Sequence, residues 1–232
     1  IVLGWHSYGK DTEGQHTSLV GNYGLKMEGL HNLPNVSFTS QIPLTPDFKF
    51  TNNHTVDPDE KIVAEDKVYI AALATDSMGI GAWTKPGRGK IPYGWQVLMN
   101  WSWMNPPALQ YFYEDKTPND YFVAGLSGPG YMYPKAIPDE KFPTLMADAR
   151  VLMDRLDLRV MEIREIVTSV ILTCPKTPAI STTKSSPMCW DSSTATAPPA
   201  PLISATIAPS SATTTTSAYI AQPKRRLPIS RN

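Results

Sequence analysis

The sequence predicts an α/β domain built as a partial or distorted (β/α) barrel and followed by a disordered C-terminal tail. Strand-like apolar runs alternate with helix-like segments up to about residue 163, which is typical of chains that form parallel sheets. The residues able to do chemistry come directly after those runs, where barrels place their sites. An open doubly wound sheet is the alternative arrangement of the same elements.

The first third of the chain predicts a strand, a helix, a second strand and a long loop. Residues 1–5 form a short apolar run that is typical of a buried strand. Residues 11–22 have the composition of a helix, and Gly24 follows as a stop signal. The alternation in residues 35–42 favours a strand. Residues 43–61 are rich in Pro, Asn and Asp, so we expect a loop there.

The middle of the chain predicts two strands and a helix. Residues 67–75 form a continuous apolar run between charges, which is typical of a strand buried on both faces. Residues 91–97 are the next candidate strand. Asn105 is a good N-cap, and the two prolines after it suit the first turn of a helix that would end near Glu114.

Three more elements complete the predicted barrel segment. Residues 121–126 form a buried strand that leads directly into the sequence Gly-Pro-Gly-Tyr-Met-Tyr-Pro of residues 128–134. Residues 141–155 form an amphipathic helix. Residues 156–163 then alternate in the manner of a strand.

Composition excludes several classes of function. The 232 residues are enough for one sizeable domain, and the formal net charge of zero argues against a nucleic-acid binder driven by phosphate attraction. We expect no membrane span, because no apolar run reaches the roughly 18 residues that one needs. The chain begins with Ile1 and shows no signal peptide, so we expect that a preceding domain of the same protein is missing.

Residues 174–232 differ in kind from residues 1–173, and we treat the two stretches as separate units. Ser, Thr, Ala and Pro make up 38 of these 59 residues, so the segment cannot bury enough apolar surface to offset the entropy of ordering it. It is either a Ser/Thr/Pro-rich stalk or, as we favour, a non-native continuation of the reading frame. Cys174 and Cys189 lie in it, either as a disulfide or as two incidental cysteines.

The segment 128–134 is the most informative motif of the chain. Gly128-Pro-Gly130-Tyr131 suits a type II turn, because proline pre-sets one backbone angle and glycine supplies the positive φ. Such a turn would hold Tyr131 and Tyr133 at the mouth of a barrel, where an apolar face with a hydroxyl binds amphipathic ligands such as sugars. Packing beneath a structural loop is the other interpretation.

This motif resembles the one that names the GxGYxYP putative glycoside hydrolase family. Residues 88–95 (RGKIPYGW) are similar to that family's RGxIPxGW stretch, and residues 117–125 are similar to the segment that leads into its motif. Gly4-Trp5 resembles the start of its C-terminal domain. The resemblance covers about residues 1–163, and it implies a barrel-like domain acting on carbohydrate, an associational inference because fold does not fix function.

Glycosidases usually need two carboxylates that flank the scissile bond. Asp76 is the first candidate, because it follows a buried strand and aligns with the first acid of the family's D-G-D-N-like stretch. Met78 replaces the second acid of that stretch and cannot transfer a proton. Glu162 is the second candidate, with a solvated surface charge as its alternative role. His6 is either a proton shuttle or a polar loop residue.

The substrate-binding candidates are aromatic and glycine residues near the predicted mouth of the barrel. They are Trp5, Trp95, Gly128, Gly130, Tyr131 and Tyr133, with Trp101 and Trp103 as further aromatic candidates. About half of the aromatic residues are expected to pack in the core instead. No metal and no cofactor are expected, because the histidines show no ligand spacing and no phosphate-binding glycine loop is present.

Three Asn-x-Ser/Thr triplets, at Asn35, Asn53 and Asn100, fit an exported, extracellular protein. Three functional hypotheses follow from the sequence: a carbohydrate-active hydrolase domain, a non-catalytic carbohydrate-binding domain on the same fold, and a truncated fragment without activity of its own.

Overall fold

The computed structural model describes residues 11–28, 35–55, 63, 66, 68–75 and 79–164, together with the backbone of three strands beyond residue 168. Trp5, His6, Asp76 and Met78 lie outside the described residues. The elements are, in chain order, α1 (Glu13–Asn22), α2 (Val36–Thr39), β1 (Tyr69–Ala74), α3 (Ile80–Trp83), β2 (Tyr93–Val97), α4 (Trp101–Met104), α5 (Pro106–Glu114), β3 (Asp120–Ala124), the 3-10 helix η1 (Pro134–Ala136), α6 (Phe142–Arg155), β4 (Val160–Arg164), β5 (Ser169–Thr173), β6 (Leu202–Ile207) and β7 (Thr216–Ala221).

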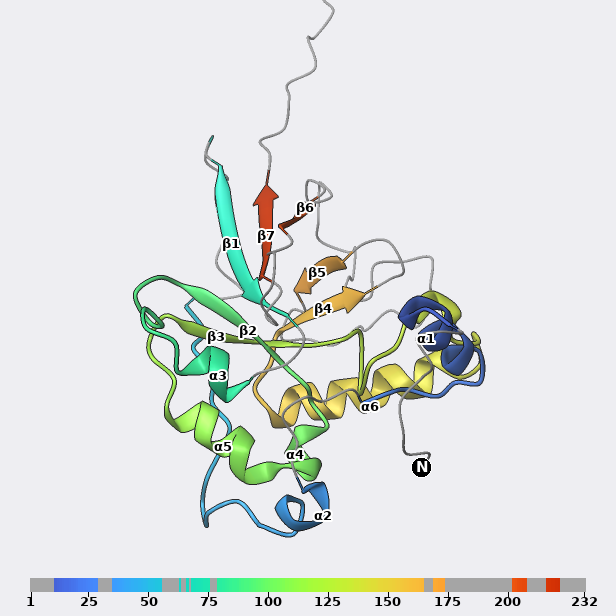
Figure 1. Ribbon diagram of the computed structural model, residues 1–232, viewed down its shortest axis with the longest axis horizontal. Helices are drawn as coiled ribbons and strands as arrows, with labels where there is room; N and C mark the ends of the chain where they lie inside the picture. The colour runs from blue at the N-terminus through green and yellow to red at the C-terminus, as the bar shows by residue number, and fades with distance from the viewer. Residues whose placement is uncertain are drawn as a thin grey trace, which may run out of the picture.

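The strands form one sheet in the order β5-β4-β3-β2-β1-β7-β6 (Figure 1). Strands β1 to β4 are parallel, and each lies beside the strand that precedes it in the chain. Strands β5 and β7 flank this parallel group in the antiparallel direction. Sequential parallel order is typical of a (β/α) barrel, whereas a doubly wound sheet reverses its order at a switch point. The predicted partial barrel is therefore confirmed, as a half-barrel of four parallel strands.

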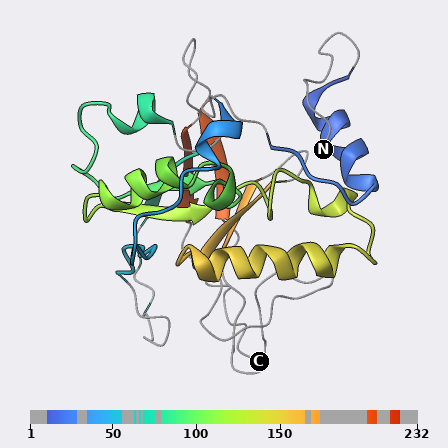
Figure 2. The same ribbon diagram turned by 90° about the horizontal axis from the view of Figure 1, so that it is seen from below.

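Helices α5 and α6 cover one face of the parallel strands (Figures 1 and 2). Because successive strand residues point to opposite faces, alternate residues of β2, β3 and β4 join the helices in one large core. These strand residues are Trp95, Val97, Phe122, Ala124, Met161 and Ile163. A second, smaller cluster on the opposite face is built from Leu73 and Val123, with Tyr121 and Val160 packed against it.

Helix α1 ends at the predicted residue and begins two residues after the predicted start. Thr12 is its N-cap, and its hydroxyl accepts from the backbone of Gln15 while the Gln15 side chain accepts from the backbone of Thr12. This reciprocal capping box satisfies two donors that the first turn would otherwise leave unpaired. The chain then leaves the helix at Gly24, which has the positive φ of 69° that glycine adopts without strain.

The strand predicted for residues 35–42 is wrong. The segment forms the one-turn helix α2, in which the Asn35 carbonyl accepts hydrogen bonds from the backbones of Phe38 and Thr39. Its alternating apolar residues do not face a core, because Phe38 is 60% exposed. No strand within the described residues pairs with this segment, so the backbone satisfies its polar groups locally instead.

The prediction that residues 67–75 form a strand buried on both faces is confirmed only for its second half. Strand β1 is present, but Tyr69 and Ile70 are exposed while Leu73 and Ala74 are buried. Strand β2 pairs with β1 only from Leu73 onwards, so the first half extends beyond the parallel sheet. Strands β6 and β7 lie in the segment predicted as a disordered tail; its other residues lie outside the described part.

Two consecutive asparagines of the predicted loop fasten it to the sheet. The Asn52 side chain accepts from the backbone N–H of Phe122 and donates to the carbonyl of Phe122, as a neighbouring strand would. The Asn53 amide donates to the carbonyls of Thr117 and Asp120. This loop therefore takes the place of a strand at the amino end of β3, where β4 makes no pairing.

Next to it, the hydroxyl of Tyr121, the ring of His54 and the carboxylate of Asp157 form a chain of contacts of 3.4 and 2.8 Å. Tyr121 is the second residue of β3, and Asp157 precedes β4. The chain resembles a catalytic relay, but it lies at the amino ends of the strands. Because barrel sites lie at the carboxyl ends and conserved contacts at the amino ends serve stability, we assign this chain a structural role.

The Asp120 carboxylate is the polar centre of the helix-covered core. It is fully buried, and it accepts hydrogen bonds from Arg88 at 2.6 Å, from Trp95 Nε1 at 2.7 Å and from Thr117 at 2.7 and 2.8 Å. Arg88 also pairs with Asp115 and lies 4.1 Å above the ring of Trp83. Buried charges are tolerated when they are paired and hydrogen-bonded in this way.

Replacing Asp120 with Ala should lower the free energy of unfolding by about 3–5 kcal/mol, because it breaks the ion pair with Arg88 and leaves the buried N–H of Trp95 without its acceptor. Chemical denaturation of the full chain measures this change. The matched control is Asp154→Ala, which removes an exposed i,i+4 pair with Arg150 and should cost about 0.5 kcal/mol or less. Equal effects of the two changes would contradict the central role of Asp120.

Candidate functional site

The carboxyl edge of the half-barrel carries both strained backbone and buried polar side chains. After β3, Leu126 and Ser127 have φ values of 63° and 77°, which cost of order 1–3 kcal/mol each in residues other than glycine. The Ser127 N–H donates to the carbonyl of Glu162 at 3.0 Å, and its hydroxyl accepts from the N–H of Arg164 at 2.6 Å. The loop after β3 is thereby fastened to the end of β4.

Glu162 is fully buried within β4 and is bound by two side chains. Arg164 Nε lies 3.2 Å from Glu162 Oε1, and the Gln96 amide donates to Glu162 Oε2. Gln96 and Glu162 belong to β2 and β4, and β3 lies between them. Their side chains meet on the face of the sheet opposite α5 and α6, since their neighbours Trp95 and Met161 pack into the helix-covered core.

Gly125 supplies the space in which this contact forms. A Cβ atom on Gly125 would lie 2.2 Å from Cγ of Gln96 and 2.7 Å from its Cδ. Such distances are far inside van der Waals contact, so any side chain at residue 125 would displace Gln96. The contact between Gln96 and Glu162 across β3 therefore requires glycine at this position.

The GxGYxYP motif joins the loop after β3 to the N-terminal segment of the chain. Met27 and Tyr131 exchange two backbone hydrogen bonds, of 3.0 and 2.7 Å, as an isolated antiparallel bridge. Gly130 has a positive φ of 143°, and a Cβ there would lie 2.8 Å from Glu28 Oε1. Gly130 is therefore required both by its backbone conformation and by the close approach of residues 26–28.

Tyr131 and Tyr133 form a short chain of hydroxyl groups with helix α1. The Tyr131 hydroxyl donates to Glu13 Oε1 at 2.7 Å and lies 2.9 Å from the Tyr133 hydroxyl, with the two rings edge to face. Burial raises the pKa of Tyr131, and its hydrogen bonds to Tyr133 and Glu13 raise it further. Tyr133 is buried. The Tyr131 hydroxyl therefore ties the motif to α1, and the Tyr133 hydroxyl contacts that of Tyr131.

Glu28 is a carboxyl group of this edge that the sequence analysis did not single out. Its Oε1 accepts a hydrogen bond from the amide of Asn100, which follows β2. The same amide donates to the carbonyl of Pro129 at 2.5 Å, and the Asn100 oxygen accepts from Trp103 Nε1 at 3.1 Å. Asn100 is buried, whereas Trp103 is 51% exposed. Asn100 therefore links a carboxyl group to an exposed aromatic ring.

Burial raises the pKa of Glu28 from its ordinary value of 4.5 to about 7. The hydrogen bond from Asn100 and the charge of Lys26 act in the opposite direction but are weaker than burial. A carboxyl group with a pKa near 7 can hold a proton at neutral pH and release it during a reaction. No local pattern around residue 28 indicates this role, because it arises only from the pairing of Met27 with Tyr131.

The structure brings together some of the sequence-predicted site residues and separates others. Glu162, Gly128 and Gly130 lie at the carboxyl edge, whereas Asp76 and Trp5 lie outside the described residues. Trp95 is 5% exposed and packs against Trp83 in the helix-covered core. The sequence signal for Gln96 is a polar residue within an otherwise apolar strand.

Two of the three candidate glycosylation asparagines use their amide groups inside the protein. The side-chain nitrogen of Asn53 donates to two backbone carbonyls, and that of Asn100 donates to Glu28 and Pro129. These nitrogens are the atoms to which a glycan would be attached. Asn35 is exposed, and its side-chain oxygen accepts from Ser37.

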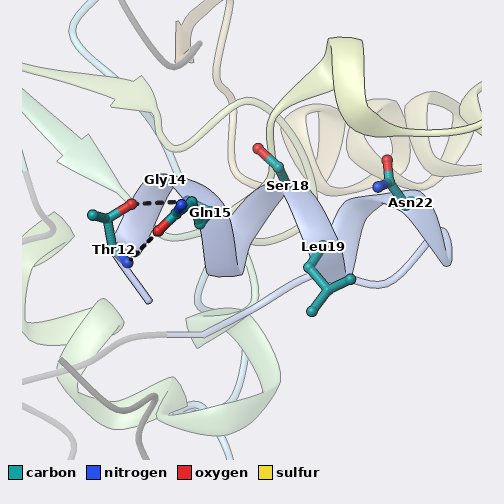
Figure 3. Close-up of a pocket in the computed structure, with 6 residues that line it drawn as sticks. All are labelled: Thr12, Gly14, Gln15, Ser18, Leu19 and Asn22. Atoms are coloured by element: carbon teal, nitrogen blue, oxygen red, sulfur yellow. Dashed lines mark hydrogen bonds between the residues drawn. The ribbon is translucent and has the colours of Figure 1, made fainter. Parts of the chain in front are cut away.

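Other kinds of site find little support in the described part of the chain. An open hollow of about 360 Å³ runs along α1 (Figure 3), and its described lining carries no charged side chain: Thr12, Gly14, Gln15, Ser18, Leu19 and Asn22. Within the described ranges, no group of three or more His, Cys, Asp or Glu side chains could hold a metal ion. None of the described helices has the length and apolar character needed to cross a membrane.

Replacing Gly125 with Ala should destabilise the protein by about 1–3 kcal/mol, because the added methyl group overpacks against Gln96. The second change Gln96→Ala should restore part of that loss in the double variant. Unfolding free energies of the two single variants and the double variant measure this coupling. Gly81→Ala is the control, since a Cβ there meets no atom within 4 Å. If the losses of unfolding free energy in the two single variants simply added up in the double variant, the steric explanation would be contradicted.

The stability of the protein should depend on the protonation of Glu28. Its folded-state pKa lies above its unfolded value, so its contribution is fully present below about pH 4.5 and is lost as the pH rises through 7. Glu28→Gln cannot titrate, and the difference in unfolding free energy between wild type and variant should change in this window. Denaturation curves between pH 4 and 8 measure it; a constant difference would contradict the raised pKa.

Comparison with known proteins agrees with this architecture. A crystal structure of a putative hydrolase from Bacteroides thetaiotaomicron VPI-5482 is similar to this chain with a TM-score of 0.54 and 23% sequence identity. The similarity covers 62% of this chain and 29% of that protein, so the matched region spans less than a third of the other chain. At this identity the likeness shows the fold alone. No curated protein matches the chain.

Two family models match the sequence. Residues 1–41 match the GxGYxYP third domain, and residues 66–222 match the GxGYxYP putative glycoside hydrolase C-terminal domain. Because the second match covers more than half of the chain and includes the motif at the carboxyl edge, this protein belongs to the GxGYxYP putative glycoside hydrolase family.

Proposed function

We propose that this protein acts on carbohydrate and hydrolyses glycosidic bonds at the carboxyl edge of its half-barrel. The observation that carries the proposal is the carboxylate of Glu162, which is buried on the face of the sheet opposite α5 and α6. Membership of a family described as putative glycoside hydrolases supports the same substrate class. Barrel enzymes place their chemistry at this edge.

Glu162 is held in place by neighbouring polar side chains. Its two oxygens contact the Arg164 guanidinium and the Gln96 amide. In glycoside hydrolysis one carboxyl group donates a proton, and the other attacks the anomeric carbon or activates water. Glu162 and Asp76 are the candidates for the second of these tasks. Asp76 follows β1 in the chain, and β1 lies parallel to β2.

The carbohydrate itself would be bound by the loop after β3 and by aromatic groups. Gly128, Gly130 and Tyr131 form one wall of this edge, and exposed aromatic rings stack against the apolar faces of sugars. Trp103 is the better placed aromatic residue, because half of it is exposed while Trp95 and Tyr133 are buried. Trp5 is kept as a candidate from the sequence.

Binding of carbohydrate without cleavage is the second candidate function. It is favoured by Met78, which stands where the family has an acid and which cannot transfer a proton. An exposed Trp103 beside the buried amide of Asn100 would serve binding equally well. Turnover separates the two functions, since a binding domain would retain glycan on an array and release no product. An extracellular location accords with either function.

The test uses the full chain and a panel of aryl glycosides and soluble glycans, with release of the aglycone or of reducing sugar as the readout. Asp76→Asn and Glu162→Gln should each lower kcat by about 10²-fold or more, since each removes a group that acts in the transition state. Asp154→Asn is the control, because Asp154 is exposed and lies on α6.

Circular dichroism and thermal denaturation must show that each variant is folded, and Glu162→Asp serves as a second variant if Glu162→Gln unfolds. Unchanged kcat in folded Asp76→Asn and Glu162→Gln would refute their proposed roles. Glycan retention by a wild-type protein that releases no product would favour the binding function.

A further inference from the structure

Three residues that no motif connects meet at the carboxyl edge: Glu28, Asn100 and Trp103. Glu28 comes from the segment matched by the third-domain model, and the other two come from the C-terminal domain. Their side chains form a continuous chain, in which Trp103 donates to Asn100 and Asn100 donates to Glu28. The chain leads from an exposed ring, through a buried amide, to a partly buried carboxyl group.

The orientation of Asn100 is fixed by three contacts. Its nitrogen donates to both Glu28 and Pro129, and its oxygen accepts from Trp103. Reversal of the amide would place an oxygen against two acceptors and a nitrogen against a donor, so only one orientation satisfies all three partners. Pro129 lies between the two glycines of the motif, and the motif therefore holds the amide that orients Glu28.

We propose that Glu28 is the proton donor to the glycosidic oxygen and that Trp103 is the aromatic platform for the sugar bound next to it. This inference rests on the proposed hydrolysis and deepens it by naming its general acid. A sugar stacked on the exposed Trp103 ring would lie within the reach of the Asn100–Glu28 pair. The active site is then completed by a carboxyl group from the third-domain segment.

In the proposed step, Glu28 gives its proton to the glycosidic oxygen while the bond from that oxygen to the anomeric carbon breaks. The leaving sugar departs as a neutral alcohol. Water supplies the new oxygen at the anomeric carbon, either directly or after a covalent intermediate on Glu162. The proton that the water loses is taken up by the Glu28 carboxylate or reaches it through solvent, so Glu28 ends the cycle protonated.

A carboxyl group that stays protonated near neutral pH suits this role, and burial of Glu28 provides it by raising its pKa to about 7. The groups that face Glu28 are consistent with a protonated carboxyl group. Lys26 is the nearby cation on its own segment. The groups that face Glu28 from the other segments are neutral: the amide of Asn100, which precedes α4, and Gly130 of the motif. No described carboxylate is hydrogen-bonded to Glu28.

The test compares two glycosides of one sugar in the full chain: a 2,4-dinitrophenyl glycoside, whose leaving group needs no proton, and a methyl glycoside, whose leaving group does. Glu28→Gln should lower kcat/KM for the methyl glycoside by about 10²- to 10⁴-fold and should change it little for the dinitrophenyl glycoside. In wild type, kcat/KM for the methyl glycoside should fall as the pH rises above about 7, and this fall should be absent in Glu28→Gln.

Glu140→Gln is the matched control, because it makes the same change at an exposed glutamate to which no role in the site is assigned. It should leave both substrates unaffected. Trp103→Ala should raise KM several-fold with little change in kcat, whereas Tyr111→Ala, which removes an exposed ring on α5, should change neither.

The outcomes separate this inference from the proposed function. The role of Glu28 would be refuted, and hydrolysis left standing, by either of two results in a protein whose wild type shows turnover. One is an unchanged kcat/KM in Glu28→Gln, and the other is an equal loss of kcat/KM on both glycosides. Absence of turnover by wild type on every sugar of the panel would refute hydrolysis and Glu28 together. Loss on the methyl glycoside alone would support both.

Discussion

The candidate site depends on the two backbone hydrogen bonds between Met27 and Tyr131. They join segments that belong to two different family domains and are separated by more than a hundred residues. Once this bridge forms, Glu28 is carried to Gly130 and Asn100, and the Tyr131 hydroxyl reaches Glu13 on α1. The motif thus acts through its backbone and its hydroxyl groups, and the acid it helps to place lies elsewhere in the chain.

Two glycines make room for the polar groups of this edge. Gly125 leaves the space that Gln96 crosses to reach Glu162, and Gly130 leaves the space beside Glu28. In both places a carboxyl group and an amide meet next to a residue that has no side chain. Buried polar groups are costly unless they are hydrogen-bonded, so the absence of a Cβ atom is what allows each carboxyl group to be both buried and satisfied.

Most of the parallel half-barrel could be predicted from the sequence, because its strands and helices obey local rules. Apolar runs predicted β2 and β3. Helix α1 begins after its N-cap Thr12, and the chain leaves it at Gly24, whose φ is positive. The strand predicted for residues 35–42 is wrong because alternation of apolar and polar residues indicates a strand only where a partner strand exists. Glu28 could not be predicted, since its burial and its contact with Asn100 arise from pairing between distant segments. Glu162 could be predicted as a candidate carboxylate because it lies near the end of a strand. Its contact with Gln96 could not be predicted, because it depends on the space at Gly125.

The Asp120 cluster has a consequence for the order in which the chain becomes structured. Its partners Arg88, Trp95 and Thr117 lie at most 32 residues away in sequence, whereas Tyr131 and Glu13 are 118 residues apart. The entropic cost of closing a loop grows with the length of chain enclosed, and local contacts form faster than distant ones. The unit β2–α5–β3 can therefore assemble around its buried carboxylate before the N-terminal segment docks, so that the candidate site is among the last parts of the molecule to be completed.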